Sequence, residues 1–173
     1  SLYIGCSSYP NEATDFNMLV NYSEFALYEA RTDRRHVINW FSENNYSREK
    51  DAYKNAQLFN RTITENLLTY HVQPIVETTT GNIVAYEALM RTDPVIYMSP
   101  LEVIDAASTY GRLYDIEKAT MWNTLTYISE HEELFSDCKL FVNSIPAYML
   151  NTEDWNALVE KHGHLMDKLV IEV

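Results

Sequence analysis

Apolar and polar residues form two kinds of pattern along the first 41 positions. Two short and mainly apolar segments, residues 2–4 and 37–41, are typical of strands. Between them, apolar and small side chains recur every three or four residues from Phe16 to Ala30, which predicts an amphipathic helix. Residues 1–41 are therefore expected to form a strand–helix–strand unit, which is too small to be a stable core by itself.

A second helical pattern follows within residues 42–67. Its apolar face comprises Ala52, Ala56, Phe59, Ile63 and Leu67. Ser47 is the expected N-cap. The simpler interpretation is a helical connector that packs on a neighbouring domain, and the alternative is a short signalling coiled coil.

The pattern changes again from Tyr70. Residues 72–77 and 83–87 predict two strands, joined by a turn over residues 78–82 that contains Gly81. About five residues can close a hairpin, but parallel strands need a crossover of a dozen or more. These two strands are therefore expected to be antiparallel.

Helix and strand patterns alternate over the rest of the chain. Ser99, Pro100 and Glu102 have the spacing of a capping box at the start of a helix. The buried stripe of this helix is expected to be Leu101, Ile104 and Ala107. A second helical stretch covers residues 116–128.

Residues 140–142 and 169–171 are fully apolar, as in buried parallel strands. Between them, residues 154–159 predict a helix with Trp155 and Leu158 facing inward. This order of elements predicts an α/β fold, either a βα barrel or a doubly wound sheet.

The charge of the chain narrows the classes of function. Its 173 residues include 13 Lys and Arg against 25 Asp and Glu, for a net charge of −12. This disfavours binding to nucleic acid polymers or to anionic membranes. The sequence has no Gly-rich phosphate loop, no apolar run of about 18 residues and no signal peptide. We therefore expect a cytoplasmic chain without a membrane segment, with the alternative that absent segments tether the parent protein to a membrane.

Cysteine and histidine residues offer little chemistry. Cys6 and Cys138 are expected to be reduced, buried thiols rather than a disulfide framework. His162-Gly-His164 is interpreted as a loop rather than half of a metal site, because no cysteine or third histidine lies nearby.

Three predicted strands end in a polar residue that carries an oxygen. Glu87 follows residues 83–86, Asn143 follows residues 140–142, and Glu172 follows residues 169–171. In a parallel βα barrel, the carboxyl ends of the strands converge on the face that holds the active site. Two carboxylates and an amide favour Mg²⁺ or Mn²⁺ over zinc. Such an ion can activate water and neutralise a phosphodiester.

These residues also have simpler interpretations. Glu87 can be a strand-end charge in solvent. Asn143, which precedes Ser144-Ile145-Pro146, can be a turn residue.

Arg91 lies four residues beyond Glu87, where its guanidinium can bind a phosphate.

Five short motifs are more informative together than separately. They are Gln73-Pro74-Ile75-Val76, Gly81-Asn82-Ile83, Glu87-Ala88-Leu89-Met90-Arg91, Phe141-Val142-Asn143 and Val170-Ile171-Glu172. Together they resemble the first part of the EAL domain of cyclic di-GMP (c-di-GMP) phosphodiesterases. The resemblance covers residues 68–173.

The resemblance implies a partial TIM-like (β/α) barrel of the EAL type, with an antiparallel first strand pair. It also implies hydrolysis of c-di-GMP to the linear dinucleotide with Mg²⁺ or Mn²⁺. Glu87, Asn143 and Glu172 would be the catalytic metal ligands, while Gln73 and Arg91 would contact the substrate.

An eight-stranded barrel needs about 250 residues, so residues 68–173 are expected to be the N-terminal part of such a domain. The acidic pair, the catalytic Lys and the further Glu of the family would follow Val173. We therefore expect an active parent protein and inactivity of these 173 residues alone. The exposed edges of a half-barrel should associate with a second copy or with the remainder of the protein.

The N-terminal segment resembles the end of a GGDEF (diguanylate cyclase-like) domain. Residues 1–5 fit its late strand, and Ala26-Leu27-Tyr28-Glu29-Ala30-Arg31 fits its final helix. Arg31 and Arg35 would then match contacts to a nucleotide phosphate, and the signature loop would lie upstream. The resemblance implies a division into residues 1–41, a connector over 42–67 and residues 68–173.

Two alternatives to an enzyme stay open. The first is a catalytically degenerate GGDEF–EAL protein that acts as a c-di-GMP receptor or scaffold. The second is an interaction module whose acidic surface and aromatic residues dock another protein.

Overall fold

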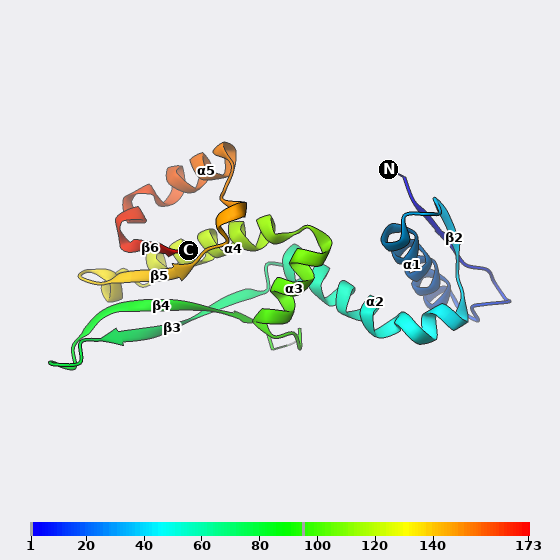
Figure 1. The fold of residues 1–173 in the computed structure, drawn as a ribbon, viewed down its shortest axis with the longest axis horizontal. Coiled ribbons are helices and arrows are strands. Elements are labelled where there is room, and N and C mark those ends of the chain that lie inside the picture. The colour runs from blue at the N-terminus through cyan, green and yellow to red at the C-terminus, as the bar shows by residue number, and fades with distance from the viewer. Residues whose placement is uncertain (1, 95) are drawn as a thin grey trace. The chain divides into compact units, whose positions relative to one another are not determined.

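The computed structural model describes residues 2–94 and 96–173, which form two compact units (Figure 1). Unit 1 is Ser1–Gln57 and unit 2 is Leu58–Val173. Ser1, the first residue of the GGDEF-like strand motif, lies outside the described residues.

Unit 1 contains the expected strand–helix–strand arrangement. Strand β1 (Ile4–Cys6) begins two residues later than expected, and helix α1 (Phe16–Asp33) separates it from β2 (Ile38–Trp40). The two strands are parallel, with Ile4 opposite Ile38. The side chain of Asp15 caps α1 by accepting a hydrogen bond from the Met18 amide.

Aromatic side chains form the core of unit 1. Phe25, Phe41 and Tyr53 are buried there, and the ring of Tyr22 stacks on that of Phe41 with centroids 3.9 Å apart. Gly5 allows β1 to lie directly against α1, because a Cβ at this position would be 2.1 Å from the carbonyl oxygen of Ser23.

Helix α2 (Glu43–Thr64) begins before the expected N-cap, so the assignment of Ser47 is wrong. Ser42 lies just before the helix, and its Oγ accepts a hydrogen bond from the Asn45 amide. Ser47 lies inside the helix and donates to the Glu43 carboxylate instead. Ser42 and Ser47 are both possible N-caps in the sequence, so a serine alone does not show where the helix begins.

Unit 2 is built on an open four-stranded sheet. Its strands are β3 (Leu68–Val76), β4 (Ile83–Thr92), β5 (Lys139–Asn143) and β6 (Leu169–Glu172), in the spatial order β3-β4-β5-β6. The pair β3–β4 is antiparallel, as the short turn predicts, and the other two pairs are parallel. The sheet does not close into a barrel.

Three long helices pack on one face of this sheet. They are α3 (Pro100–Tyr110), α4 (Leu113–Glu130) and α5 (Thr152–His162), accompanied by the 3₁₀ helices η1 (Glu132–Phe135), η2 (Pro146–Tyr148) and η3 (Gly163–Lys168). Leu125 of α4, Leu140 of β5 and Leu158 of α5 are fully buried in one hydrophobic cluster. The opposite face of the sheet carries no helix among the described residues.

Local signals for α3 are accurate, whereas its buried face is not the expected one. Both hydrogen bonds of the capping box between Ser99 and Glu102 are present. Leu101 is 70% exposed, and Val103 and Ala107 are buried instead. At about 100° per residue, Leu101 and Val103 point to nearly opposite sides of the helix, so the stripe is rotated from the prediction.

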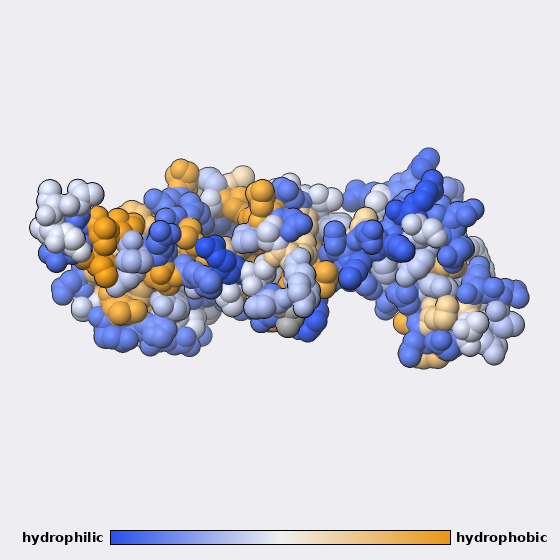
Figure 2. All heavy atoms as spheres, turned by 90° about the horizontal axis from the view of Figure 1, so that it is seen from below, coloured by the Kyte–Doolittle hydropathy of each residue, from blue (hydrophilic) through white to orange (hydrophobic). Residues whose placement is uncertain are grey.

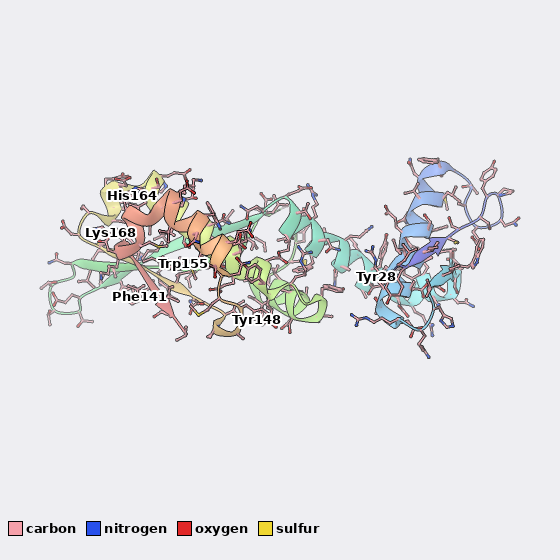
Figure 3. The ribbon with its side chains drawn as sticks, turned by 90° about the horizontal axis from the view of Figure 1, so that it is seen from above. Tyr28, Phe141, Tyr148, Trp155, His164 and Lys168 are labelled. Atoms are coloured by element: carbon pink, nitrogen blue, oxygen red, sulfur yellow. The ribbon has the colours of Figure 1, made fainter. Side chains whose placement is uncertain are left out.

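Two further side-chain expectations fail in α5. Trp155, labelled in Figure 3, is 41% exposed rather than inward, while Leu158 three residues later is fully buried. His162 is not in a loop: it is the buried last residue of α5, and η3 follows it directly.

Cys6 and Cys138 are both free, as expected, but they are half-buried rather than buried. In the part of the chain that the structure describes, no helix is both long enough and apolar enough to cross a membrane.

Candidate functional site

The site predicted from sequence lies on the helix-free face of the sheet. Ala88, Leu140 and Val142 pack in the core under the helices. Neighbouring residues in a strand point to opposite faces, so Glu87 and Asn143 face the other side. Figure 3 labels Phe141 of β5, which stands opposite Glu87 in the register of the two strands.

Gln73 and Glu87 are brought together by the β3–β4 hairpin. They are directly opposite each other in the antiparallel register, and residues in such a pair share a face of the sheet. Gln73 is exposed and Glu87 is half-buried. The hairpin therefore places an amide beside a carboxylate on the helix-free face.

Asn143 reaches the same carboxylate from the end of β5. Its Nδ2 donates a hydrogen bond of 3.2 Å to Oε1 of Glu87, which lies 56 residues away in sequence. This bond leaves the amide oxygen of Asn143 as the remaining polar atom of that side chain. Asn143 thus joins Gln73 and Glu87 in one polar group.

Glu172 is adjacent to Asn143 across the next pair of strands. The two residues are opposite each other in the parallel register of β5 and β6. The last bond of this ladder runs from the Ser144 amide to the Glu172 carbonyl oxygen, at 2.9 Å. Four polar side chains from four adjacent strands therefore occupy neighbouring positions on one face.

The structure changes one element of the sequence argument. Asn143 and Glu172 are the last residues of β5 and β6, but Glu87 lies in the middle of β4, which continues to Thr92. The extension arises because β3 pairs with β4 along its whole length, from Leu68 opposite Thr92 onward. Glu87 is nevertheless one residue short of the last β4–β5 pair, Ala88 with Val142.

Arg91 lies near this polar group beside an open pocket of about 380 Å³. The pocket is lined by Asn143 and Arg91 at the sheet and by apolar side chains from the helices, including Ile104 and Ile116. The Arg91 guanidinium donates to the carbonyl oxygen of Met90 at 2.8 Å. The pocket therefore combines an apolar wall with a cation and an amide.

Tyr70 forms part of the wall of this pocket. Its hydroxyl shares a hydrogen bond of 2.8 Å with Oγ1 of Thr120. Burial raises the pKa of Tyr70 to about 12, and the Glu117 carboxylate contributes in the same direction. Tyr70 is therefore a neutral hydrogen-bonding group across the physiological pH range.

Sequence reasoning missed Glu117 entirely. This residue of α4 is only 2% exposed, and its carboxylate accepts hydrogen bonds from Oγ of Ser144 at 2.6 Å and from the Ile145 amide at 2.8 Å. Both partners directly follow Asn143. The available signal was an acidic residue next to Ile116 in the predicted helical stretch 116–128.

Arg31 and Arg35, the two expected phosphate contacts, lie in unit 1. Arg31 is in the last turn of α1, where a cation suits the helix dipole. Arg35 is beyond the helix and is highly exposed, and its guanidinium pairs with the carboxylate of Asp33. An anion that binds Arg35 must therefore compete with Asp33.

The donor set of the polar group fits a hard divalent cation. Glu87, Asn143 and Glu172 offer oxygen atoms only, which is the ligand type that Mg²⁺ and Mn²⁺ prefer. Among the described residues, no group of three or more His, Cys, Asp or Glu side chains could hold a metal ion. A site here therefore depends on the amide oxygen of Asn143 together with the two carboxylates.

Comparison of the sequence with known proteins gives a partial match. The chain matches no family model. Over 110 residues it is 28% identical to an uncharacterized signaling protein of Caulobacter vibrioides, which covers 62% of this chain and 14% of that protein.

Solved structures are similar at low sequence identity. The EAL domain of Xanthomonas citri FimX in complex with c-di-GMP gives a TM-score of 0.59 at 14% identity, over 72% of this chain and 50% of that one. The PaMucR phosphodiesterase in its c-di-GMP complex gives 0.57 at 17% identity, over 69% and 51%.

A third structure extends over both units. The S helix-GGDEF-EAL segment of Vibrio cholerae LapD gives a TM-score of 0.54 at 11% identity, over 91% of this chain and 38% of that one. This chain spans about half the length of the solved EAL domains that it matches. The mixed sheet with its antiparallel first pair is therefore an EAL-type fold, in the form of an open partial barrel.

Proposed function

We propose that this chain is part of a c-di-GMP signalling protein whose ligand binds on the helix-free face of the unit 2 sheet. The observation that carries the proposal is the hydrogen bond between Asn143 and Glu87, with Gln73 and Glu172 at the neighbouring register positions. Support comes from the likeness in fold to EAL domains solved with c-di-GMP.

Each residue has a role that follows from its chemistry. Glu87, Asn143 and Glu172 would hold Mg²⁺ or Mn²⁺, which lowers the pKa of bound water and neutralises phosphate charge. The Arg91 guanidinium binds a phosphate oxygen through its N–H groups. The Gln73 amide, beside Glu87, hydrogen-bonds the ligand.

In the intact parent protein these groups serve hydrolysis of c-di-GMP to the linear dinucleotide. In this proposal the 173 residues alone do not turn over substrate, because the acidic pair, the catalytic Lys and the further Glu of the family are not among them. The preceding piece belongs to a GGDEF-like domain, with Arg31 and Arg35 as phosphate contacts. The cytoplasm is the expected compartment for such a protein.

The open sheet also supports association. β3 and β6 are its outer strands, and exposed strand edges favour pairing with another chain. Figure 2 shows apolar residues gathered towards the hairpin end of unit 2, where Ile75, Val76, Ile83 and Val84 are exposed. We propose that a second copy or the remainder of the protein covers this surface.

A turnover assay of the longer parent protein tests the enzymatic proposal. The parent is incubated with Mn²⁺ and c-di-GMP, and the linear dinucleotide is measured by chromatography. Production that is lost in Glu87→Gln supports a phosphodiesterase. Retained binding of c-di-GMP without product supports the alternative, a catalytically degenerate receptor or scaffold.

A further inference from the structure

The buried carboxylate of Glu117 stands outside the ligand set described above. A carboxylate that is 2% exposed is costly unless its oxygens accept hydrogen bonds. Here both oxygens are engaged: Oε1 by the Ser144 hydroxyl and Oε2 by the Ile145 amide. The acidic side chain therefore makes its hydrogen bonds with one short segment of another element.

That segment is the chain directly after Asn143. On the other side, the Ser144 amide donates to the Glu172 carbonyl oxygen at 2.9 Å, which is the last bond of the β5–β6 ladder. The backbone at residues 144 and 145 is thus held by β6 and by α4 together. Without Glu117 the amide of Ile145, which lies beyond the end of the strand, would lose its acceptor, and the segment would keep the ladder bond and the local bond from the Tyr148 amide to the Ile145 carbonyl oxygen.

The position of this backbone determines where the Asn143 side chain can reach. Asn143 is the last residue of β5, is exposed, and meets Oε1 of Glu87 at 3.2 Å. A hydrogen bond of this length is lost on a shift of about 1 Å. Fixing the two residues that follow therefore fixes the geometry of the amide on the helix-free face.

The part of α4 that carries Glu117 is held in place by buried contacts. Ile116, adjacent to Glu117, is buried in the cluster beneath α3, and Thr120 one turn later bonds the Ile116 carbonyl oxygen at 2.8 Å. The hydroxyl of Thr120 also bonds that of Tyr70 on β3. Helix α4 therefore forms hydrogen bonds both to β3, the strand that carries Gln73, and to the segment that follows Asn143.

We propose that Glu117 is a positioning residue of the metal and c-di-GMP site, acting through Ser144 and Ile145 on Asn143. This proposal rests on the proposed function. Partners that orient a metal ligand in this way typically account for 10- to 100-fold in metal affinity.

The test compares four variants of the 173-residue chain. Glu117→Ala removes both hydrogen bonds, and Ser144→Ala removes one of them while keeping the carboxylate. Glu117→Gln keeps both, because its amide oxygen accepts from Ile145 and its NH₂ donates to the Ser144 hydroxyl. Thr124→Ala is the matched control: this buried threonine of α4 bonds only the carbonyl oxygens of its own helix.

Two readouts separate positioning from general stability. The first is the NMR signal of the Asn143 side-chain amide without metal, and the second is Mn²⁺ affinity by electron paramagnetic resonance. Glu117→Ala and Ser144→Ala should shift or broaden the amide signal and weaken Mn²⁺ binding by about 10- to 100-fold. Glu117→Gln should stay within about threefold of the original chain, and Thr124→Ala should lower only the melting temperature.

Several results overturn the proposal. An unchanged Asn143 signal in Ser144→Ala and Glu117→Ala contradicts it, and so does a loss in Thr124→Ala as large as that in Ser144→Ala. Equal weakening by Glu117→Gln and Glu117→Ala contradicts positioning by hydrogen bonds. If the original chain binds no Mn²⁺, the proposed function fails, while the metal-free amide signal still decides the role of Glu117. If Glu117→Ala does not fold, Ser144→Ala and Glu117→Gln decide it.

Discussion

Replacing Leu158 with alanine tests whether α5 closes the core under the candidate site. Leu158 is fully buried in the cluster that contains Leu125 of α4 and Leu140 of β5. The substitution removes three carbon atoms, and each buried methylene is worth about 0.8 kcal/mol, so the lost transfer free energy is about 2.4 kcal/mol. The cavity left behind raises the total to about 3–4 kcal/mol.

Urea unfolding followed by tryptophan fluorescence measures this loss. Trp122 and Trp155 lie in unit 2 and Trp40 lies in unit 1, so a Trp40→Phe background makes the signal specific to unit 2. With a denaturant dependence of about 2 kcal/mol per molar urea, the midpoint should fall by about 1.5–2 M.

Leu101→Ala is the matched control, because it makes the same chemical change on another helix of unit 2. Leu101 is 70% exposed, so its free energy of unfolding should change by less than about 0.5 kcal/mol. The reasoning is refuted if Leu158→Ala costs under 1 kcal/mol, or if the two variants lose the same stability.

Further predictions concern unit 1 and the pH dependence of unit 2. Gly5→Ala should destabilise unit 1 by at least about 1–3 kcal/mol, because the added Cβ would lie 2.3 Å from the Leu27 amide nitrogen. The same urea assay, without the Trp40 substitution, measures this loss. An unchanged midpoint contradicts the close packing of β1 on α1. Burial and the nearby Lys161 lower the pKa of His162, so its stabilising contribution is present above the unfolded value near 6.5 and is lost as pH falls through the lowered folded value. Unit 2 should therefore lose stability on acidification from pH 7 in urea titrations, and His162→Gln should flatten this dependence; equal slopes for both chains would contradict it.

Local chemistry determined which parts of the fold could be read from the sequence. The capping box of Ser99 and Glu102 involves atoms three residues apart, and the β3–β4 hairpin follows from the length of its turn. Both expectations are confirmed. The rotation of α3 and α5 about their axes depends on what they pack against, and this is why Leu101 and Trp155 are wrongly assigned to the core.

The candidate site was likewise only partly predictable from the sequence. The carboxyl-end rule predicts that Glu87 and Asn143 meet, although Glu87 proves to lie within a longer strand. Their roles in metal and substrate binding stay predictions. Glu117 could not be found in this way, because its partners Ser144 and Ile145 are 27 and 28 residues away and only the packing of α4 brings them together.

The most direct test of the account is a calorimetric titration of the 173-residue chain with c-di-GMP, with and without Mn²⁺. The chain should bind c-di-GMP in the presence of Mn²⁺, and Asn143→Ala and Arg91→Ala should each weaken binding by about 10- to 100-fold, as expected for the loss of about 1.5–3 kcal/mol per charge-assisted contact. Lys168→Ala is the control, because its ammonium group donates to the Ser136 carbonyl oxygen at a different place in unit 2. Absence of binding, or binding that neither Asn143→Ala nor Arg91→Ala weakens, would contradict the central claim.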